Sequence, residues 1–234
     1  MVRGGYARAV ISEPAVPSLL TDQVFARIQA AIMQGDLPAG TRLRIRDLAA
    51  EVGTSVMPVR EAIRRLEQAG LAERVPHRGA VVRGLTLSEL VHVYDVRLLL
   101  EVEAARLGSR SITVPDVELM ERDFEQMLTA IDQGEVVSYL DHDEQLLTRL
   151  YLASGNPVLV QTIQSLWQQC RGYKILGARA ALENRQNSLL WEYQERLVAA
   201  ARAHDGDAAA AINVLSLTAA RGRINTQLVQ QDAV

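Results

Sequence analysis

The sequence has little sulfur and few aromatic residues, and it lacks long apolar runs: among 234 residues there are one cysteine, two tryptophans and two phenylalanines. The lone Cys170 excludes an internal disulfide, and its helical surroundings predict a small core or interface residue rather than a reactive thiol. With so few aromatics and abundant Ala, Leu and Val, helix packing is favoured over a β-sandwich. No stretch approaches the roughly 20 apolar residues of a membrane span, and residues 1–18 lack a signal-peptide core. We therefore expect a cytoplasmic protein with no membrane segment.

Basic residues are slightly outnumbered by acidic ones, 25 to 28, and they are unevenly distributed. Residues 18–84 hold ten arginines and no lysine against seven acidic residues, whereas residues 85–234 hold 13 basic and 20 acidic residues. Only the first of these regions has a positive excess, so a phosphate-binding surface is expected there. The excess is small, which disfavours a nonspecific architectural protein that coats DNA.

Breaker residues and hydrophobic periodicity divide the chain into three regions. Residues 1–17 have no periodicity and predict a flexible arm. Residues 18–84 predict a helix, a short helix, a third helix and a hairpin with a basic tip. Residues 85–234 predict about six helices of roughly 17–25 residues, joined by short loops as in an antiparallel all-α bundle.

The order of elements in residues 18–84 is typical of a winged helix-turn-helix with a small β-hairpin wing. Gly53 permits the sharp turn before the third helix. Three apolar residues would bury the back of that helix: Val59, Ile63 and Leu66. The opposite side would present four side chains to a DNA major groove: Ser55, Met57, Arg60 and Arg64. The fold class is therefore mainly α, with a winged helix-turn-helix followed by a helical bundle.

Fixed spacings in this region carry a family resemblance. The run Leu48-Ala49-x-x-x-Gly53-x-Ser55-x-x-Pro58-Val59-Arg60-Glu61-Ala62-x-x-x-Leu66-x-x-x-Gly70-Leu71, with Arg78-Gly79-Ala80-x-Val82, resembles the GntR family of bacterial regulators across nearly all of residues 20–84. The resemblance implies that Arg46, Ser55 and Arg60 contact phosphates and bases. It also implies that His77, Arg78 and Gly79 form a wing tip in the minor groove.

The sequence departs from that family at one position of the third helix. The residue after Ser55 is commonly arginine in such proteins and is Val56 here. A bidentate arginine–guanine contact is worth about 1–3 kcal/mol of discrimination. Val56 therefore predicts an altered operator preference, with an apolar contact to a thymine methyl group in place of the guanine contact.

Ionisable residues lie on apolar helices in the second region. The helix predicted over about 88–108 is apolar nearly all round, so we expect it in the middle of the bundle, yet it carries Arg97 and Glu101. Two interpretations remain open: a structural Arg97–Glu101 bridge, or an Arg97 that faces an anionic ligand. Asp143 likewise falls on the apolar stripe of a helix over about 136–153. It requires a partner, which predicts a polar cavity.

This region resembles the FCD ligand-sensing domain of the FadR-like branch of GntR regulators, through Arg97-x-x-x-Glu101-x-x-Ala104-Ala105 and the run from Asp143 to Ser154-Gly155-Asn156-Pro157. Many such domains hold zinc or nickel on one aspartate and three histidines. The aspartate is present as Asp143, but the three histidine positions hold Leu147, Gln194 and Ser216. We therefore predict no metal or other cofactor. The predicted pocket is lined by Arg97, Glu101, Asp143 and Gln194.

Together these features predict a homodimeric, sequence-specific transcriptional regulator of double-stranded DNA. Its operator would have palindromic half-sites that mirror the two-fold axis of the protein. A small effector, expected to be a carboxylate, would bind the helical domain and modulate DNA affinity. In the alternative interpretation the helical domain only dimerises and has lost ligand sensing. An enzyme is disfavoured, because the sequence offers no nucleophile–base pair and no open metal site.

Overall fold

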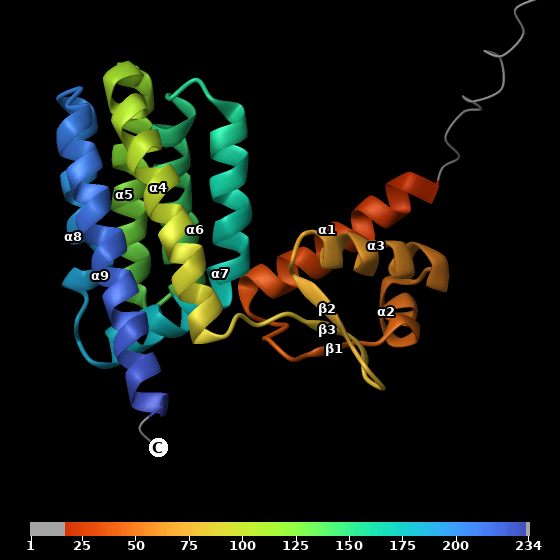
Figure 1. The fold of residues 1–234 in the computed structure, drawn as a ribbon. Helices are drawn as coiled ribbons and strands as arrows, with labels where there is room; N and C mark the ends of the chain where they lie inside the picture. The colour runs from red at the N-terminus through yellow and green to blue at the C-terminus, as the bar shows by residue number, and fades with distance from the viewer. Residues whose placement is uncertain (1–16, 233–234) are drawn as a thin grey trace, which may run out of the picture. The chain divides into compact units, whose positions relative to one another are not determined.

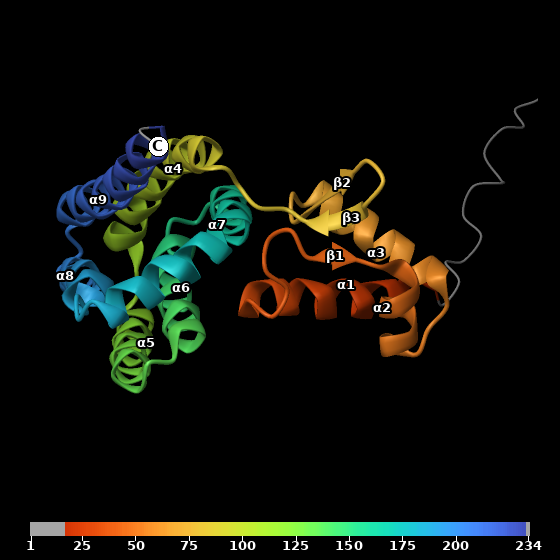
Figure 2. The ribbon, with the colours of Figure 1, turned by 90° about the horizontal axis from the view of Figure 1, so that it is seen from below.

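The computed structural model describes the backbone of residues 17–232 and the side-chain surroundings of residues 19–227. The chain forms two compact units, Met1–Arg83 and Gly84–Val234, which are drawn in Figures 1 and 2. The predicted flexible arm lies outside the described residues, except for Pro17, which is the first residue of a helix.

The N-terminal unit is a winged helix-turn-helix, as predicted. Its elements in chain order are α1 (Pro17–Gln34), β1 (Arg42–Leu43), α2 (Ile45–Val52), α3 (Val56–Gln68), β2 (Ala72–Val75) and β3 (Gly79–Val82). The strands form an antiparallel sheet in the order β1-β3-β2, with Arg42 opposite Val81 and Ala72 opposite Val82. Strand β1 was not predicted, because two residues are too few to show an alternating pattern.

The core of this unit lies where the back of α3 packs on α1 and the sheet. The predicted back face of α3 is confirmed, since Val59, Ile63 and Leu66 are all buried. The tight turn before α3 depends on Gly53, whose φ of 71° is left-handed and which caps α2. At the other end of α3 we expect Gly70 as the cap from the sequence, but the cap is Ala69, one residue earlier, and Gly70 follows it with a left-handed φ of 72°.

The C-terminal unit is a bundle of six helices within the described residues, also as predicted. They are α4 (Leu87–Ser111), α5 (Val114–Gln133), α6 (Val136–Leu152), α7 (Pro157–Glu183), α8 (Ser188–Arg202) and α9 (Gly206–Asp232). Their lengths run from 15 to 27 residues, a wider range than predicted. Short loops join them at the predicted breaks.

Helix α4 approaches its neighbours closely. A Cβ atom on Gly108 would lie 2.0 Å from the carbonyl oxygen of Leu150 on α6, so only glycine fits at this crossing. The buried residues of α4 form one stripe, because they are adjacent or three to four positions apart: Leu90, Tyr94, Arg97, Glu101, Ala104, Ala105, Gly108 and Ser109.

The expectation that α4 lies in the middle of the bundle is wrong for its other side. Val96 is 42% exposed and Leu99 is 74% exposed in the single chain. The buried stripe of α4 already accommodates the neighbouring helices, and that leaves these two apolar residues on the surface. Arg97 and Glu101, in contrast, lie on the covered stripe.

Candidate DNA-binding surface and effector pocket

The first turn of α3 presents a mixed apolar and polar surface. Ser55 is the N-cap residue, but its hydroxyl makes no capping hydrogen bond. Val56 and Met57 are 40% and 64% exposed, and Arg60 is exposed one turn later. The backbone N–H groups at a helix N-terminus favour anions, so this end of α3 suits a DNA phosphate.

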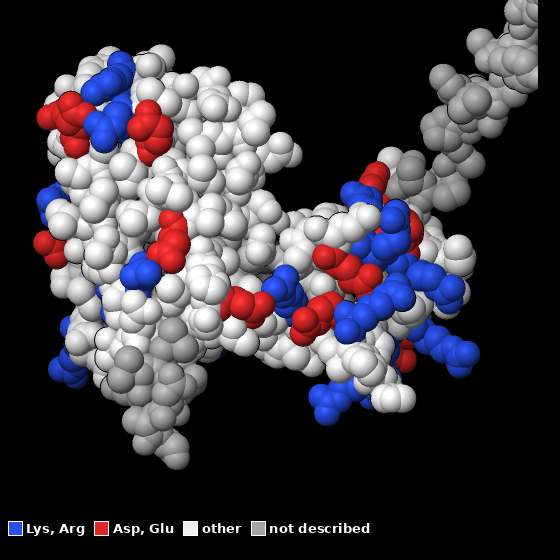
Figure 3. All heavy atoms as spheres, viewed as in Figure 1, with Lys and Arg blue, Asp and Glu red and all other residues white. Residues whose placement is uncertain are grey.

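The arginines of the N-terminal unit fall into two groups. Arg46, Arg60 and Arg78 are exposed, and none has a carboxylate partner among the described residues. Arg64, which was also predicted to face DNA, donates to Glu61 at 2.5 Å and 3.0 Å instead. This hydrogen bond lowers the pKa of Glu61 and raises that of Arg64. On the face drawn in Figure 3, arginines gather over this unit.

The wing has a strained tip. In the turn between β2 and β3, the N–H of Arg78 donates to the carbonyl oxygen of Val75 at 3.0 Å. His77 adopts a left-handed φ of 62°, and Gly79 follows at 77°. A left-handed histidine is uncommon, and such strain often persists at functional sites. His77, Arg78 and Gly79 are all exposed, as a DNA contact requires.

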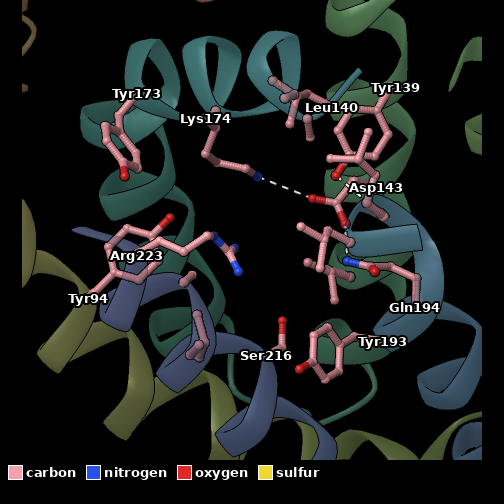
Figure 4. A pocket seen from close by; sticks show the side chains of 18 of the residues that line it. Tyr94, Tyr139, Leu140, Asp143, Tyr173, Lys174, Tyr193, Gln194, Ser216 and Arg223 are labelled. Carbon is pink, nitrogen blue, oxygen red and sulfur yellow. Dashed lines mark hydrogen bonds and ion pairs between the residues drawn. The ribbon is translucent and has the colours of Figure 1, made fainter. Parts of the chain in front are cut away.

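The C-terminal unit encloses a cavity of about 270 Å³, lined by residues of α4, α6, α7, α8 and α9. Figure 4 shows its polar wall. All four predicted pocket residues line this one cavity: Arg97, Glu101, Asp143 and Gln194. The structure therefore brings together residues that lie up to 97 positions apart in the sequence.

Arg97 and Glu101 form a buried ion pair at one side of the cavity. Arg97 Nε donates to Glu101 Oε1 at 2.6 Å, and the guanidinium lies 4.5 Å from the centre of the Tyr94 ring. Glu101 also accepts from Trp167 Nε1 at 2.9 Å and from the Tyr151 hydroxyl at 3.2 Å. Burial alone would lower the pKa of Arg97, but the charges of Glu101, Cys170 and Tyr94 and the hydrogen bond to Glu101 together raise it. Of the two open interpretations, this geometry favours the structural bridge.

Asp143 accepts hydrogen bonds from two residues, Gln194 and Lys174, and Lys174 lies outside the sequence motifs that carry the family resemblance. Asp143 Oδ1 accepts from Gln194 Nε2 on α8 at 2.7 Å, and its Oδ2 accepts from Lys174 Nζ on α7 at 3.2 Å. Lys174 also donates to Glu144 at 3.0 Å. Burial would lower the pKa of Lys174, but Glu144 and Asp143 outweigh it and raise the pKa above its usual value. The ammonium therefore stays charged.

Sequence reasoning missed several lining residues. Lys174 is the only lysine in the chain, and this rarity was a signal that could have marked it. The five tyrosines in residues 19–227 all line the cavity: Tyr94, Tyr139, Tyr151, Tyr173 and Tyr193. Burial raises the pKa of Tyr139 and of Tyr94, so both phenols remain neutral hydrogen-bond donors.

Arg223 on α9 is the third basic residue of the lining, and sequence reasoning missed it too. Its guanidinium points into the cavity in Figure 4. Unlike Arg97 and Lys174, Arg223 is exposed to solvent, and it has no carboxylate within ion-pair distance in the described part of the chain. It is therefore the lining cation that is available to an anion.

The donors around Asp143 do not fit a divalent transition metal. Leu147 and Ser216 line the cavity at the positions that the resemblance assigns to histidines. Both oxygens of Asp143 accept N–H donors, and residues 19–227 contain no cluster of three His, Cys, Asp or Glu side chains suited to a metal. His142 Nδ1 faces α5, at 3.8 Å from Asp123.

A winged helix-turn-helix with unpaired arginines, in one chain with a helical unit around a polar cavity, defines the class of DNA-binding regulators that carry a sensor domain. Comparison with known families specifies the class further. The profile of bacterial regulatory proteins of the gntR family matches residues 20–82, and the profile of the FCD domain matches residues 92–217. The chain belongs to the GntR family of transcriptional regulators and has an FCD domain.

Individual relatives agree with this assignment. The chain is 27% identical to the HTH-type transcriptional regulator McbR of Escherichia coli over 148 residues, 63% of this chain and 67% of McbR. It is 31% identical to the Glc operon transcriptional activator of E. coli over 166 residues, 63% and 65% of the two chains. With the gluconate operon transcriptional repressor of Bacillus subtilis it shares 34% identity over 122 residues, 52% of this chain and 47% of the repressor. The matched segments thus span about half to two thirds of these relatives.

Solved structures show the same fold. The structure of E. coli McbR superposes with a TM-score of 0.76 at 23% identity, covering 89% of this chain and 98% of McbR. A GntR regulator from Rhodococcus sp. RHA1 superposes with a TM-score of 0.73 at 19% identity, over 88% and 97% of the two chains. Within the described residues, no helix combines the length and apolarity needed to span a membrane.

Proposed function

We propose that this chain is a dimeric, operator-binding transcriptional regulator whose DNA affinity is set by a small anionic effector in the cavity of the FCD domain. The observation that carries the proposal is the cavity cation Arg223, which has no carboxylate partner in the described residues. Two of the relatives named above are transcriptional regulators of operons, which supports the same activity. A regulator of this kind acts beside the bacterial chromosome, in the cytoplasm.

The proposed DNA contacts come from two elements of the N-terminal unit. Helix α3 would enter the major groove with Ser55, Met57 and Arg60, while Arg46 on α2 would bind a phosphate. The wing residues His77, Arg78 and Gly79 would reach the minor groove. Arg64 would contribute less, because Glu61 already neutralises it.

A dimer would place two such units on a palindromic operator. The exposed apolar residues Val96 and Leu99 of α4 suit a contact with a second copy of the chain. The variant Leu99→Asp is expected to sediment as a monomer, because a charge would be buried in the contact. Val158→Asp is the matched control, since Val158 is 71% exposed on α7. Equal sedimentation of Leu99→Asp and the wild type would remove α4 from the interface.

The proposed effector is a carboxylate that binds Arg223, with its polar groups directed to the Asp143–Gln194 side of the cavity. A guanidinium offers paired N–H donors that match a carboxylate. The neutral tyrosine phenols and Ser216 would then donate to, or accept from, ligand hydroxyl groups. The cavity volume of about 270 Å³ lies just below the range typical of pockets for drug-sized ligands, so it suits a small metabolite.

A thermal-shift screen of small carboxylates tests the effector proposal, because a ligand that binds only the native state raises its stability. A binding carboxylate should raise the wild-type Tm and lose this effect in Arg223→Gln. Arg221→Gln is the matched control: Arg221 lies on the same helix, pairs with Asp95 and is outside the cavity lining. The effector is then added to operator-binding titrations.

The second candidate function is a regulator whose FCD domain only dimerises. The residues Leu147, Gln194 and Ser216 favour this candidate, since each replaces a histidine of metal-bearing FCD domains. A wild-type Tm that no carboxylate shifts, together with operator binding that none of them alters, would support dimerisation alone.

A further inference from the structure

Lys174 is an unusual residue for the interior of this protein. It is the only lysine among 234 residues, and only 12% of its side chain is exposed. An ammonium is strongly hydrated and is seldom buried without partners. Here Asp143 Oδ2 lies 3.2 Å from Nζ and Glu144 Oε1 lies 3.0 Å from it. Two consecutive carboxylates of α6 thus converge on a single cation.

The position of this cation is informative because Asp143 is the one residue of the family's metal-binding set that the chain retains. A metal ligand must turn a lone pair to the ion. Both oxygens of Asp143 instead accept N–H donors, one from Lys174 and one from Gln194 Nε2 at 2.7 Å. Leu147 has no lone pair to offer. The carboxylate is therefore neutralised by an amine that the chain itself supplies.

We propose that the Lys174 ammonium is the resident cation of this pocket and stands in for the metal ion of metal-bearing FCD domains. It supplies the positive charge beside Asp143 from α7, a helix that carries none of the four metal-ligand positions, which lie on α6, α8 and α9. A ligand is then recognised by fixed N–H donors and without coordination to a metal. The inference concerns the same cavity as the proposed effector site, but it does not depend on which effector binds.

The ammonium also has capacity left for a ligand. It carries three N–H donors, and within residues 19–227 only Asp143 and Glu144 accept from it. Lys174 and Arg223 both line the cavity, and their side chains point into it in Figure 4. An acceptor atom in the cavity can thus be held by Lys174 while a carboxylate is held by Arg223.

Rebuilding the metal site tests the proposal with zinc as the only probe. The triple variant Leu147→His, Gln194→His and Ser216→His restores the missing histidines and keeps Lys174. A quadruple variant adds Lys174→Gln, which removes the charge and retains an N–H donor for the carboxylates. We expect the quadruple variant to bind one zinc per chain at least 100-fold more tightly than the triple variant, because a fixed cation repels Zn²⁺ from the same place. Lys174→Arg on the triple background is the matched control and should keep zinc binding weak.

Zinc content, titration calorimetry and circular dichroism after chelator treatment provide the readouts. Wild-type protein should hold well under one zinc per chain. Stoichiometric zinc in the wild type, equal zinc affinity in the triple and quadruple variants, or a folded quadruple variant that binds none would each overturn the proposal. If the quadruple variant unfolds without metal, zinc-induced refolding supports the proposal and failure to refold counts against it. No effector enters these assays, so they separate this proposal from the effector proposal.

Discussion

The two units of this protein each contain an Arg–Glu pair on one helix, and the pairs differ mainly in exposure to water. In the DNA-binding unit, Arg64 Nη2 and Glu61 Oε1 lie 2.5 Å apart, and the two side chains are 54% and 44% exposed. In the FCD domain, Arg97 Nε and Glu101 Oε1 lie 2.6 Å apart, and the two side chains are only 5% and 2% exposed. Water screens the Arg64–Glu61 pair, so this pair adds little stability and mainly reduces the positive charge of the surface. In the Arg97–Glu101 pair each charge depends on the other, because no water is available to solvate either charge if its partner is removed.

The same contrast extends to the sites as a whole. The DNA-binding surface leaves Arg46, Arg60 and Arg78 exposed and unpaired, which suits phosphates that arrive from solution. The cavity pairs its two covered cations, Arg97 and Lys174, with carboxylates, and its third cation, Arg223, is an exposed residue without a carboxylate partner in the described part of the chain. The DNA-binding surface thus carries unpaired positive charges, whereas Arg97 and Lys174 at the cavity are paired with carboxylates.

The largest effect is expected from Glu101→Gln, which leaves the buried Arg97 without its counter-ion. Breaking a buried ion pair costs about 3–5 kcal/mol, so the free energy of unfolding should fall by that order. Urea unfolding followed by circular dichroism measures it. The equivalent change in the exposed pair, Glu61→Gln, should leave unfolding unchanged.

The double variant Arg97→Met with Glu101→Gln provides the control for this prediction. It removes both charges, and replacing a buried pair by apolar groups is often neutral, so most of the lost stability should return. Equal instability of the single and double variants would show that Glu101 acts through Trp167 and Tyr151 and not through Arg97.

The next effect concerns DNA. Arg60→Ala should weaken operator binding by about 1–3 kcal/mol, roughly fivefold to 150-fold, while the Tm stays near that of the wild type because Arg60 is exposed. Fluorescence anisotropy with an operator duplex measures the affinity. Arg27→Ala is the control, since Arg27 is an exposed arginine of α1. A similar loss in both variants would indicate a general charge effect, and a collapsed Tm would make Arg60 structural.

These two predictions also mark how much the sequence could reveal. The DNA-binding surface of the winged helix-turn-helix was predictable, because it depends on residues that are close together in the sequence. Gly53 allows the turn before α3, and Val59 and Leu66 define its buried face. Arg60 therefore lies on the outward face. The cavity was predictable only for residues with a motif, such as Asp143. Its partner Lys174 lies 31 residues away on another helix, and only the packing of α6 on α7 brings the two together.

A smaller effect is expected from Val56, which tests whether the DNA-binding unit reads an apolar group. Replacing the facing thymine by deoxyuridine removes one methyl group, and this should cost the wild type about 0.8 kcal/mol, roughly fourfold in affinity. Val56→Arg should lose this sensitivity and gain a preference for guanine. Binding-site selection followed by anisotropy measures both. Unchanged base preference in Val56→Arg would place Val56 outside the base contacts.

The smallest effect is expected from acid, and it distinguishes a partly buried glutamate, Glu144, from an exposed one, Glu61. Burial would raise the pKa of Glu144, but Lys174 and Arg171 outweigh it, so the pKa lies below the ordinary 4.5. A lowered pKa stabilises the folded state fully above the unfolded-state value and loses that contribution as pH falls through the folded value. Wild-type protein should therefore lose more stability than Glu144→Gln between about pH 5 and pH 3. Glu61, whose pKa is also lowered, is exposed, so any acid effect of Glu61→Gln should vanish in high salt while that of Glu144→Gln persists. Identical pH profiles for Glu144→Gln and the wild type would mean that the two cations of α7 do not hold this carboxylate in the folded protein.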